Sequence, residues 1–211
     1  MPRPREFDEQ EVVARATDLF RHFGYHATSV RDLGSALALT PSSLYRTFGD
    51  KHTLFLRALD HYRATDSAEA EARLSGTGPC RDILRAWLLW LVSGDNGGDG
   101  GEHTSLGCFV VNTTTELGAA DPEVRRRTEA AFEVTRQAIA AVLHRGCRNG
   151  ELSADLDVGA AVELLFTTVL GLRVRERACH DPAGLVSTID FAIRALGPAP
   201  GQDGSADRAG G

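Results

Sequence analysis

The sequence predicts an all-α protein of about nine helices. Apolar residues recur at intervals of three and four along most of the chain, which is the spacing of one helix face. Serine, threonine or aspartate stands just before many of these stretches, and proline or an acidic residue often follows within the first turn. Glycine ends several of them, as at Gly24 and Gly49. Local start and stop signals therefore agree with the periodicity, and both indicate helices.

The first three helices are expected at residues 8–23, 29–37 and 41–47. Asp8 is placed to cap the first, and either Thr28 or Ser29 to cap the second. Thr40 is placed to cap the third, whose first position is Pro41, where the missing amide hydrogen costs nothing. The turn between the second and third helices is only Ala38-Leu39. Two short helices joined by such a turn form a helix-turn-helix, whose second helix enters the DNA major groove.

A fourth helix is expected to begin at Lys51, behind the cap Asp50, and to run to about residue 75. An apolar segment around Trp87 predicts another helix, and further helices are expected at residues 106–117, 122–150, 157–178 and 182–196. The β-branched residues of 106–117 leave a strand open as an alternative there. Residues 93–102 are expected to be a flexible loop, and residues 197–211 a disordered tail.

The segments TSVRDL (28–33) and LTPSSLYRTFGDKHTLF (39–55) resemble the DNA-binding domain of the TetR family of bacterial transcriptional regulators. The resemblance extends without gaps over residues 7–62. One departure is Ala38, where the family usually has glycine. If the φ angle of Ala38 is positive, alanine costs about 1 kcal/mol relative to glycine, which a fold can absorb.

The resemblance implies three regions. Residues 1–50 would form the DNA-binding domain, residues 51–196 a ligand-binding and dimerisation domain with a linking helix at 51–75, and residues 197–211 the tail. Eight residues are expected to contact double-stranded operator DNA: Thr28, Ser29, Thr40, Ser42, Ser43, Tyr45, Arg46 and Lys51. Of these, Ser42, Ser43 and Arg46 face outward and are candidates for base edges, while the others are candidates for the phosphate backbone. Arg3 or Arg5 would reach the minor groove.

A single helix-turn-helix buries too little surface for useful specificity, so a homodimer on a near-palindromic operator is expected. By the resemblance, the last two helices would pair with their symmetry mates through two apolar stripes. Their residues are Val158, Val162, Leu165, Phe166, Val169 and Leu172, then Leu185, Ile189, Ile193 and Leu196. The alternative is that these stripes only close the core of one chain.

The resemblance also implies a pocket for an unidentified small-molecule inducer, which makes a ligand-responsive repressor the favoured function. Aromatic and polar residues of the larger region are candidates to line that pocket: Trp87, Trp90, Phe109, Asn112, Glu116, Phe132, Arg136 and Phe166. The sequence alone does not separate a repressor from an activator.

The segment GCFVVN (107–112) resembles an element of some TetR-like proteins and suggests a second hypothesis. Cys108 begins a predicted helix, where the dipole favours the thiolate form, so a redox- or electrophile-sensing regulator is the alternative function. The competing interpretation is that Cys108 is a small buried apolar residue.

An enzyme is disfavoured because no GxSxG, HExxH or paired-cysteine signature occurs. No cofactor or metal site is expected. No apolar run approaches the roughly 18 residues of a membrane span, and the N-terminus lacks an apolar signal segment, so a cytoplasmic location is expected. The net charge is −6, but residues 1–63 hold nine Arg and Lys against eight Asp and Glu. The DNA-binding end is thus the more positive one, although modestly.

Overall fold

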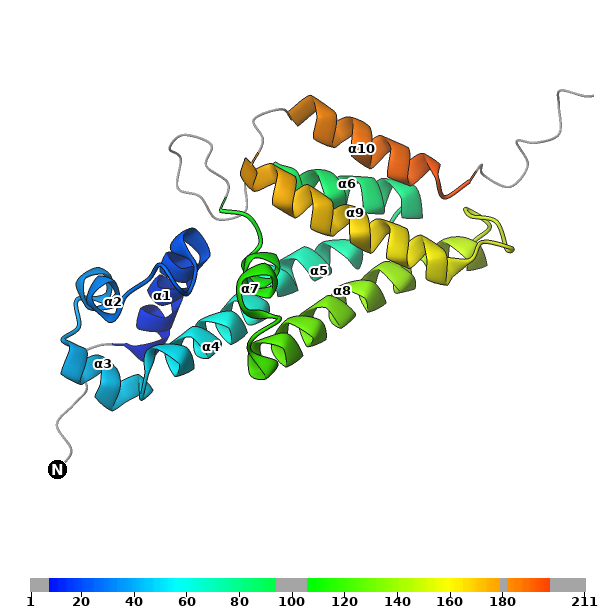
Figure 1. Ribbon diagram of the computed structural model, residues 1–211. Helices are drawn as coiled ribbons and strands as arrows, with labels where there is room; N and C mark the ends of the chain where they lie inside the picture. Colours follow the sequence, from blue (N-terminus) through cyan, green and yellow to red (C-terminus); the bar gives the residue numbers. More distant parts are fainter. Residues whose placement is uncertain (1–7, 94–105, 179–181, 198–211) are drawn as a thin grey trace, which may run out of the picture. The chain divides into compact units, whose positions relative to one another are not determined.

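The structure of the protein is a computed structural model that describes residues 8–93, 106–178 and 182–197. Within these ranges every regular element is helical, which confirms the predicted all-α class. The ten α-helices are α1 Glu9–Phe23, α2 Val30–Leu37, α3 Pro41–Phe48, α4 Lys51–Tyr62, α5 Ala68–Leu74, α6 Cys80–Val92, α7 Phe109–Leu117, α8 Pro122–Arg148, α9 Val158–Ala178 and α10 Pro182–Arg194 (Figure 1).

The long helix expected from Lys51 is present, but its middle is underwound. A π-helical segment, Arg63–Ser67, joins α4 to α5, so that helical backbone runs on to Leu74. Counting this run once, the described ranges contain the nine helices that the sequence predicts. The alternative of a strand at residues 106–117 is wrong, because α7 occupies most of that segment. The predicted loop at 93–102 and tail at 197–211 lie almost entirely outside the described residues.

The chain divides into two compact units. The first contains residues 1–68 and 106–131, and the second contains residues 69–105 and 132–211. The functional division at residue 50 stays a prediction, because compactness does not show which residues bind DNA or ligand.

The core of the first unit contains a cluster of aromatic side chains. In this unit α4 and α7 both pack against α1. Phe55 meets the ring of Phe20 edge-on at 5.0 Å between centroids and that of Phe109 at 5.5 Å, while Tyr62 meets Phe109 at 5.8 Å. All four side chains are buried. Edge-to-face contacts of this kind add to the free energy of apolar burial, so they fix α7 against the helices of the N-terminal segment.

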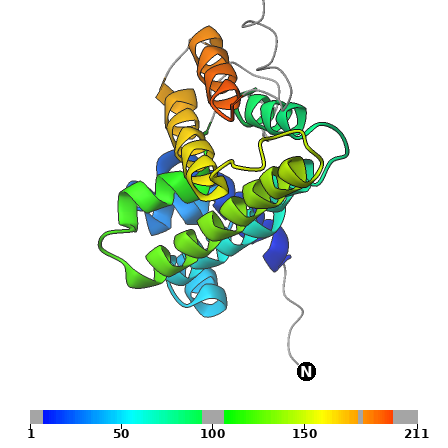
Figure 2. The same cartoon turned by 90° about the vertical axis from the view of Figure 1, so that its right-hand side faces the viewer.

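The second unit is a helical bundle in which α6, α9 and α10 lie side by side (Figures 1 and 2). Its core includes Leu84, Leu88, Leu143, Leu165 and Ile189, each fully buried. Cys80 belongs to this core, and burial together with the neighbouring Glu151 raises the pKa of its thiol to about 11. A Cβ added at Gly146 would lie 2.6 Å from the Cys80 sulfur, so glycine is required at this approach.

The turn of the helix-turn-helix has a positive φ at Ala38, the conformation that is less favourable for alanine than for glycine. Ala38 has φ 54° and ψ 39°, the left-handed region, and is the only non-glycine residue with positive φ within the described ranges. This backbone lets the Ala38 amide donate to the Gly34 carbonyl and end α2. The fold therefore tolerates a strained alanine here.

Replacing Ala38 with glycine is expected to raise the stability of the first unit by roughly 0.5–1 kcal/mol, because glycine removes the steric cost of positive φ. Thermal unfolding followed by circular dichroism measures the change. The matched control is Ala36→Gly inside α2, which should destabilise by about 1 kcal/mol. A lower melting temperature for Ala38→Gly would contradict the strain argument.

Candidate DNA-binding interface

Side-chain caps hold the helices of the N-terminal segment in place. Ser29 begins α2 with a reciprocal capping box: its hydroxyl accepts from the Asp32 amide at 3.2 Å, and the Asp32 carboxylate accepts from the Ser29 amide at 2.9 Å. Asp50 accepts from the Thr53 amide at 2.6 Å at the start of α4, and this hydrogen bond lowers the pKa of the Asp50 carboxyl. The predicted caps Asp8 and Thr40 are confirmed.

Helix α3 buries one side and presents the other to solvent. Leu44 and Phe48, four residues apart, are buried, whereas Ser42 and Arg46 are exposed and Tyr45 is 49% exposed. The exposed Tyr45 side chain suits a contact with DNA, because DNA would cover its apolar ring and offer its hydroxyl a hydrogen-bond partner. Of the three residues predicted to face outward, Ser42 and Arg46 are exposed, whereas Ser43 is half-buried.

Three hydroxyl groups cluster at the N-terminus of α3. The Thr40 hydroxyl lies 3.0 Å from that of Ser42 and 3.1 Å from that of Ser43, and it accepts from the Ser43 amide at 3.2 Å. Because the N-terminal end of a helix also carries unpaired amide hydrogens, this cluster suits contact with phosphate or with a base edge. Arg46, one turn further along, has no partner among the described side chains.

Lys51 plays a structural part that the sequence did not indicate. Its ammonium donates to the carbonyl oxygens of Tyr25 at 2.9 Å and Thr28 at 3.0 Å, and it lies 4.0 Å from the centroid of the Tyr25 ring. These contacts tie the start of α4 to the segment between α1 and α2. They leave one of the three ammonium hydrogens for a phosphate.

Thr28 does not suit the predicted phosphate contact. It is only 1% exposed, its hydroxyl donates to the Gly24 carbonyl at 2.7 Å, and its amide donates to the Tyr25 carbonyl. Burial and these two bonds take its polar groups away from solvent. Ser29 is exposed beside it and keeps access to DNA. Arg3 and Arg5 lie outside the described residues.

Glu116 of α7 holds the turn between α1 and α2. Its carboxylate accepts from the backbone amides of Tyr25 at 2.9 Å and His26 at 2.7 Å. A Cβ added at Gly24, whose φ is +84°, would lie 2.8 Å from a Glu116 oxygen. Glycine therefore serves both the backbone and this close approach. The sequence suggested a ligand contact for Glu116, but its carboxylate is used within the first unit.

A buried arginine makes a second connection within this unit. Arg21 of α1 is 5% exposed and donates to the Gly107 carbonyl at 2.9 Å, next to Cys108 at the start of α7. Its guanidinium also lies 3.5 Å from the Asp66 carboxylate. Arg21 lies in the last turn of α1, where an arginine side chain usually faces water. Its position in the sequence therefore gave no indication of these buried contacts.

The candidate ligand residues fall into two groups. Phe109 is buried in the aromatic core of the first unit, and Asn112 donates to the Leu106 carbonyl at 3.1 Å, so with Glu116 these three pack within that unit. The other five lie in the second unit: Trp87, Trp90, Phe132, Arg136 and Phe166. There the Arg136 guanidinium lies 4.1 Å over the Phe166 ring, and Phe132 meets that ring at 5.4 Å.

The apolar stripes assigned to the dimer interface are buried within one chain. Leu165, Val169 and Leu172 of α9 and Ile189 of α10 belong to the core of the second unit, and so do the other stripe residues, apart from the half-buried Val158 at its edge. The physical reason is that α9 is apolar around most of its circumference, so its strongest stripe closes the core. Large apolar side chains are exposed on the remaining faces: Leu164 at 43%, Val174 at 51% and Phe191 of α10 at 69%.

Comparison with known proteins agrees with this geometry. Residues 12–58 match the family model described as bacterial regulatory proteins, tetR family, and residues 98–192 match the tetracyclin repressor-like C-terminal domain. The HTH-type transcriptional repressor BdcR of Escherichia coli is 36% identical over 196 residues, which cover 92% of this chain and 91% of BdcR. The chain belongs to the TetR family of bacterial transcriptional regulators.

Other TetR family members match along nearly their whole length. The uncharacterised HTH-type transcriptional regulator YezE of Bacillus subtilis is 30% identical, with coverage of 93% of this chain and all of YezE. A cysteine variant of the TetR family regulator CifR, solved with 26-base-pair operator DNA, has a TM-score of 0.77 and 28% identity, covering 92% of this chain and 99% of CifR. This TetR family member is thus a DNA-binding transcriptional regulator. Within the described ranges, no helix is long and apolar enough to cross a membrane.

Proposed function

We propose that this TetR family member is a ligand-responsive repressor that binds a near-palindromic operator as a homodimer. The observation that carries the proposal is the outward face of α3, where Ser42, Tyr45 and Arg46 are exposed behind a capped N-terminus. The relatives BdcR and ComR of Escherichia coli are both described as repressors, which favours repression over activation. A repressor of this kind would act in the cytoplasm, where the bacterial chromosome lies.

The dimer would form on the exposed face of α9 and α10. Positions three and four apart on α9 form one exposed stripe: Ala160, Leu164, Thr167, Gly171, Val174 and Ala178. A Cβ added at Gly171 would meet nothing within 4 Å, so the single chain leaves this point open to a closely approaching helix. Phe191 extends the apolar surface on α10. A self-complementary patch of this kind suits a two-fold axis.

The inducer would bind the second unit, in which Trp87, Trp90, Phe132, Arg136 and Phe166 lie. In the first unit, Glu116 and Arg21 link α7 to α1 and to the turn before α2. A shift of α7 would therefore move the helix-turn-helix, and a ligand that prefers the shifted state would weaken operator binding.

The proposal is tested by titrating the purified protein onto DNA from upstream of its own gene, at two salt concentrations and against unrelated competitor DNA of equal length. The expected result is tight binding of two protomers per site that survives competitor. Binding lost equally to competitor at every promoter fragment tried would contradict a specific operator-binding function.

Substitution of Lys51 by alanine is expected to weaken binding to all DNA sequences and to reduce the slope of log affinity against log salt by about 1. It should also lower the melting temperature, because the carbonyls of Tyr25 and Thr28 lose their donor. Arg46→Ala is the matched control: it should change sequence preference without affecting stability. An unchanged salt slope in a folded Lys51 variant would exclude the phosphate contact.

A thiol-sensing regulator is the second candidate function. Cys108 occupies the N-cap position of α7, is half-buried, and directly follows Gly107, whose carbonyl accepts from Arg21. Addition of the thiol to an electron-poor alkene, with the thiol proton passing to the adduct carbon, would add bulk at this junction. The solved CifR–operator complex contains a cysteine variant of that protein, which makes cysteine chemistry worth testing here.

Cys108→Ser is expected to abolish release of operator DNA by N-ethylmaleimide if Cys108 is the sensor, because serine preserves size but does not add to the alkene at neutral pH. Fluorescence anisotropy of labelled operator measures the release. Cys147→Ser, which removes another half-buried thiol, is the control and should leave release intact. Equal release from the wild-type protein and the Cys108 variant would assign Cys108 to packing.

A further inference from the structure

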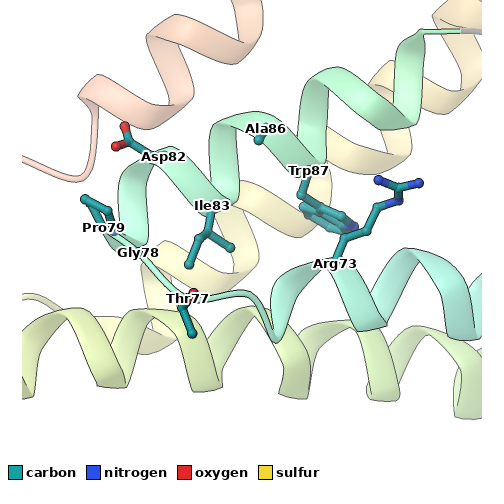
Figure 3. A pocket seen from close by; sticks show the side chains of 8 residues that line it. All are labelled: Arg73, Thr77, Gly78, Pro79, Asp82, Ile83, Ala86 and Trp87. Carbon is teal, nitrogen blue, oxygen red and sulfur yellow. The ribbon is translucent and has the colours of Figure 1, made fainter.

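A pocket of about 390 Å³ lies at the turn between α5 and α6 (Figure 3). It is lined by Arg73, Thr77, Gly78, Pro79, Asp82, Ile83, Ala86 and Trp87, all within the second unit. Only Trp87 of these residues was a candidate ligand contact from the sequence. The pocket opens on the side of α6 that carries Ile83 and Ala86, so its wall is largely apolar.

One buried polar atom at this pocket has no partner among the residues that the structure describes. Trp87 is 2% exposed, and its indole nitrogen makes no hydrogen bond to any of them. A buried N–H without an acceptor is unfavourable, because it has lost its bonds to water and gained none from the protein. An acceptor atom from a bound molecule would remove this deficit.

A positive charge stands at the same end of the pocket. Arg73 lines it, and the Arg73 guanidinium lies 4.1 Å over the ring of Trp90 and donates to Glu69 at 3.0 Å. Stacking and the ion pair hold the guanidinium in place. The hydrogen bond to Glu69 uses one of its N–H groups and leaves the others for a ligand. Figure 3 shows Arg73 and Trp87 bordering one end of the pocket.

The opposite end carries a negative charge. Figure 3 shows Asp82 and Pro79 at the end away from Arg73, with the apolar side chain of Ile83 between the two ends. A ligand with one carboxylate can place it at the Arg73 end and its apolar body along α6. A second anionic group at the far end of the ligand would face Asp82 and be repelled.

We propose that this pocket binds small aromatic monocarboxylates, with the carboxylate accepting from the Trp87 indole and the Arg73 guanidinium. The ring of the ligand covers Ile83 and Ala86, so apolar burial and two donors act together. Its use as the inducer site rests on the proposed repressor function, whereas the binding itself does not.

Calorimetric titration of the full-length protein with benzoate, without DNA, tests the binding. Saturable binding is expected, and it should weaken about tenfold in Trp87→Phe, which keeps the bulk but removes the N–H. Arg73→Gln, at a position whose side chain is 45% exposed, should weaken it as much and keeps the test valid if the Trp87 variant does not fold. Benzyl alcohol and terephthalate should bind more weakly than benzoate.

The control is Arg85→Gln, which removes an exposed arginine of α6 that pairs with Asp190 outside the pocket. It should leave benzoate affinity unchanged. Absence of benzoate binding, or equal affinity in the wild-type, Arg73 and Trp87 proteins, overturns the site. Operator release by benzoate is measured separately: binding without release overturns the inducer role alone, and failure to bind any operator overturns the repressor function alone.

Discussion

Leu164→Glu is expected to convert the protein to a monomer and to lower its operator affinity on the order of a thousandfold, toward the level of non-specific binding. Leu164 is 43% exposed in the middle of the open stripe of α9. A carboxylate placed there would be buried without a partner at a two-fold interface, which is strongly unfavourable. Light scattering after size exclusion gives the oligomeric state, and anisotropy of labelled operator gives the affinity.

Val134→Glu is the matched control, because Val134 is also exposed, at 41%, in the second unit but lies on α8. It should stay dimeric and bind operator normally. Gly171→Leu provides an independent variant: the single chain has room for the side chain, so only a closely packed dimer is disturbed. A dimeric Leu164→Glu protein would show that the interface lies elsewhere.

Glu176→Ala is expected to destabilise the second unit by about 3–5 kcal/mol. Glu176 accepts from Arg173 at 2.9 Å, and the side chains of both are only about 5% exposed. Arg173 also donates to the Leu91 carbonyl, which keeps the guanidinium in the core. Removing the carboxylate takes a hydrogen-bonded ion pair away from a buried guanidinium. Urea unfolding measures the loss.

Glu69→Ala is the control for this second variant, since Glu69 pairs with Arg73 on an exposed face, where such pairs contribute about 0.3–0.5 kcal/mol. A loss below about 1 kcal/mol for Glu176→Ala would mean that water reaches Arg173 and that the pair is not part of the core.

The sequence predicted the helices well because their signals are local. Ser29, Thr40 and Asp50 cap the helices expected to follow them. Ala38 has a positive φ, at the turn position where the family usually has glycine. The π-helical segment at 63–67 was not predicted, since a shift in backbone hydrogen bonding leaves no periodicity of its own.

Long-range partners were harder to predict. Nothing near Glu116 in sequence indicates that its carboxylate meets amides 90 residues away. The exposed Leu164, Val174 and Phe191 were missed because the buried stripes dominate the apolar pattern of the same helices. Thr28 has the residue type of a phosphate contact, but its burial depends on the packing of the folded unit.

The hydrogen bonds of the Glu116 carboxylate limit how DNA-binding domains can be exchanged between TetR family relatives. The unit that contains the helix-turn-helix is made of two stretches, residues 1–68 and 106–131. A chimera joined at residue 50 would carry the recognition helix but leave Glu116 behind, and the amides of Tyr25 and His26 would lose their acceptor. A transplant that preserves operator recognition therefore includes α7 from the same donor, or keeps glutamate and glycine matched at positions 116 and 24.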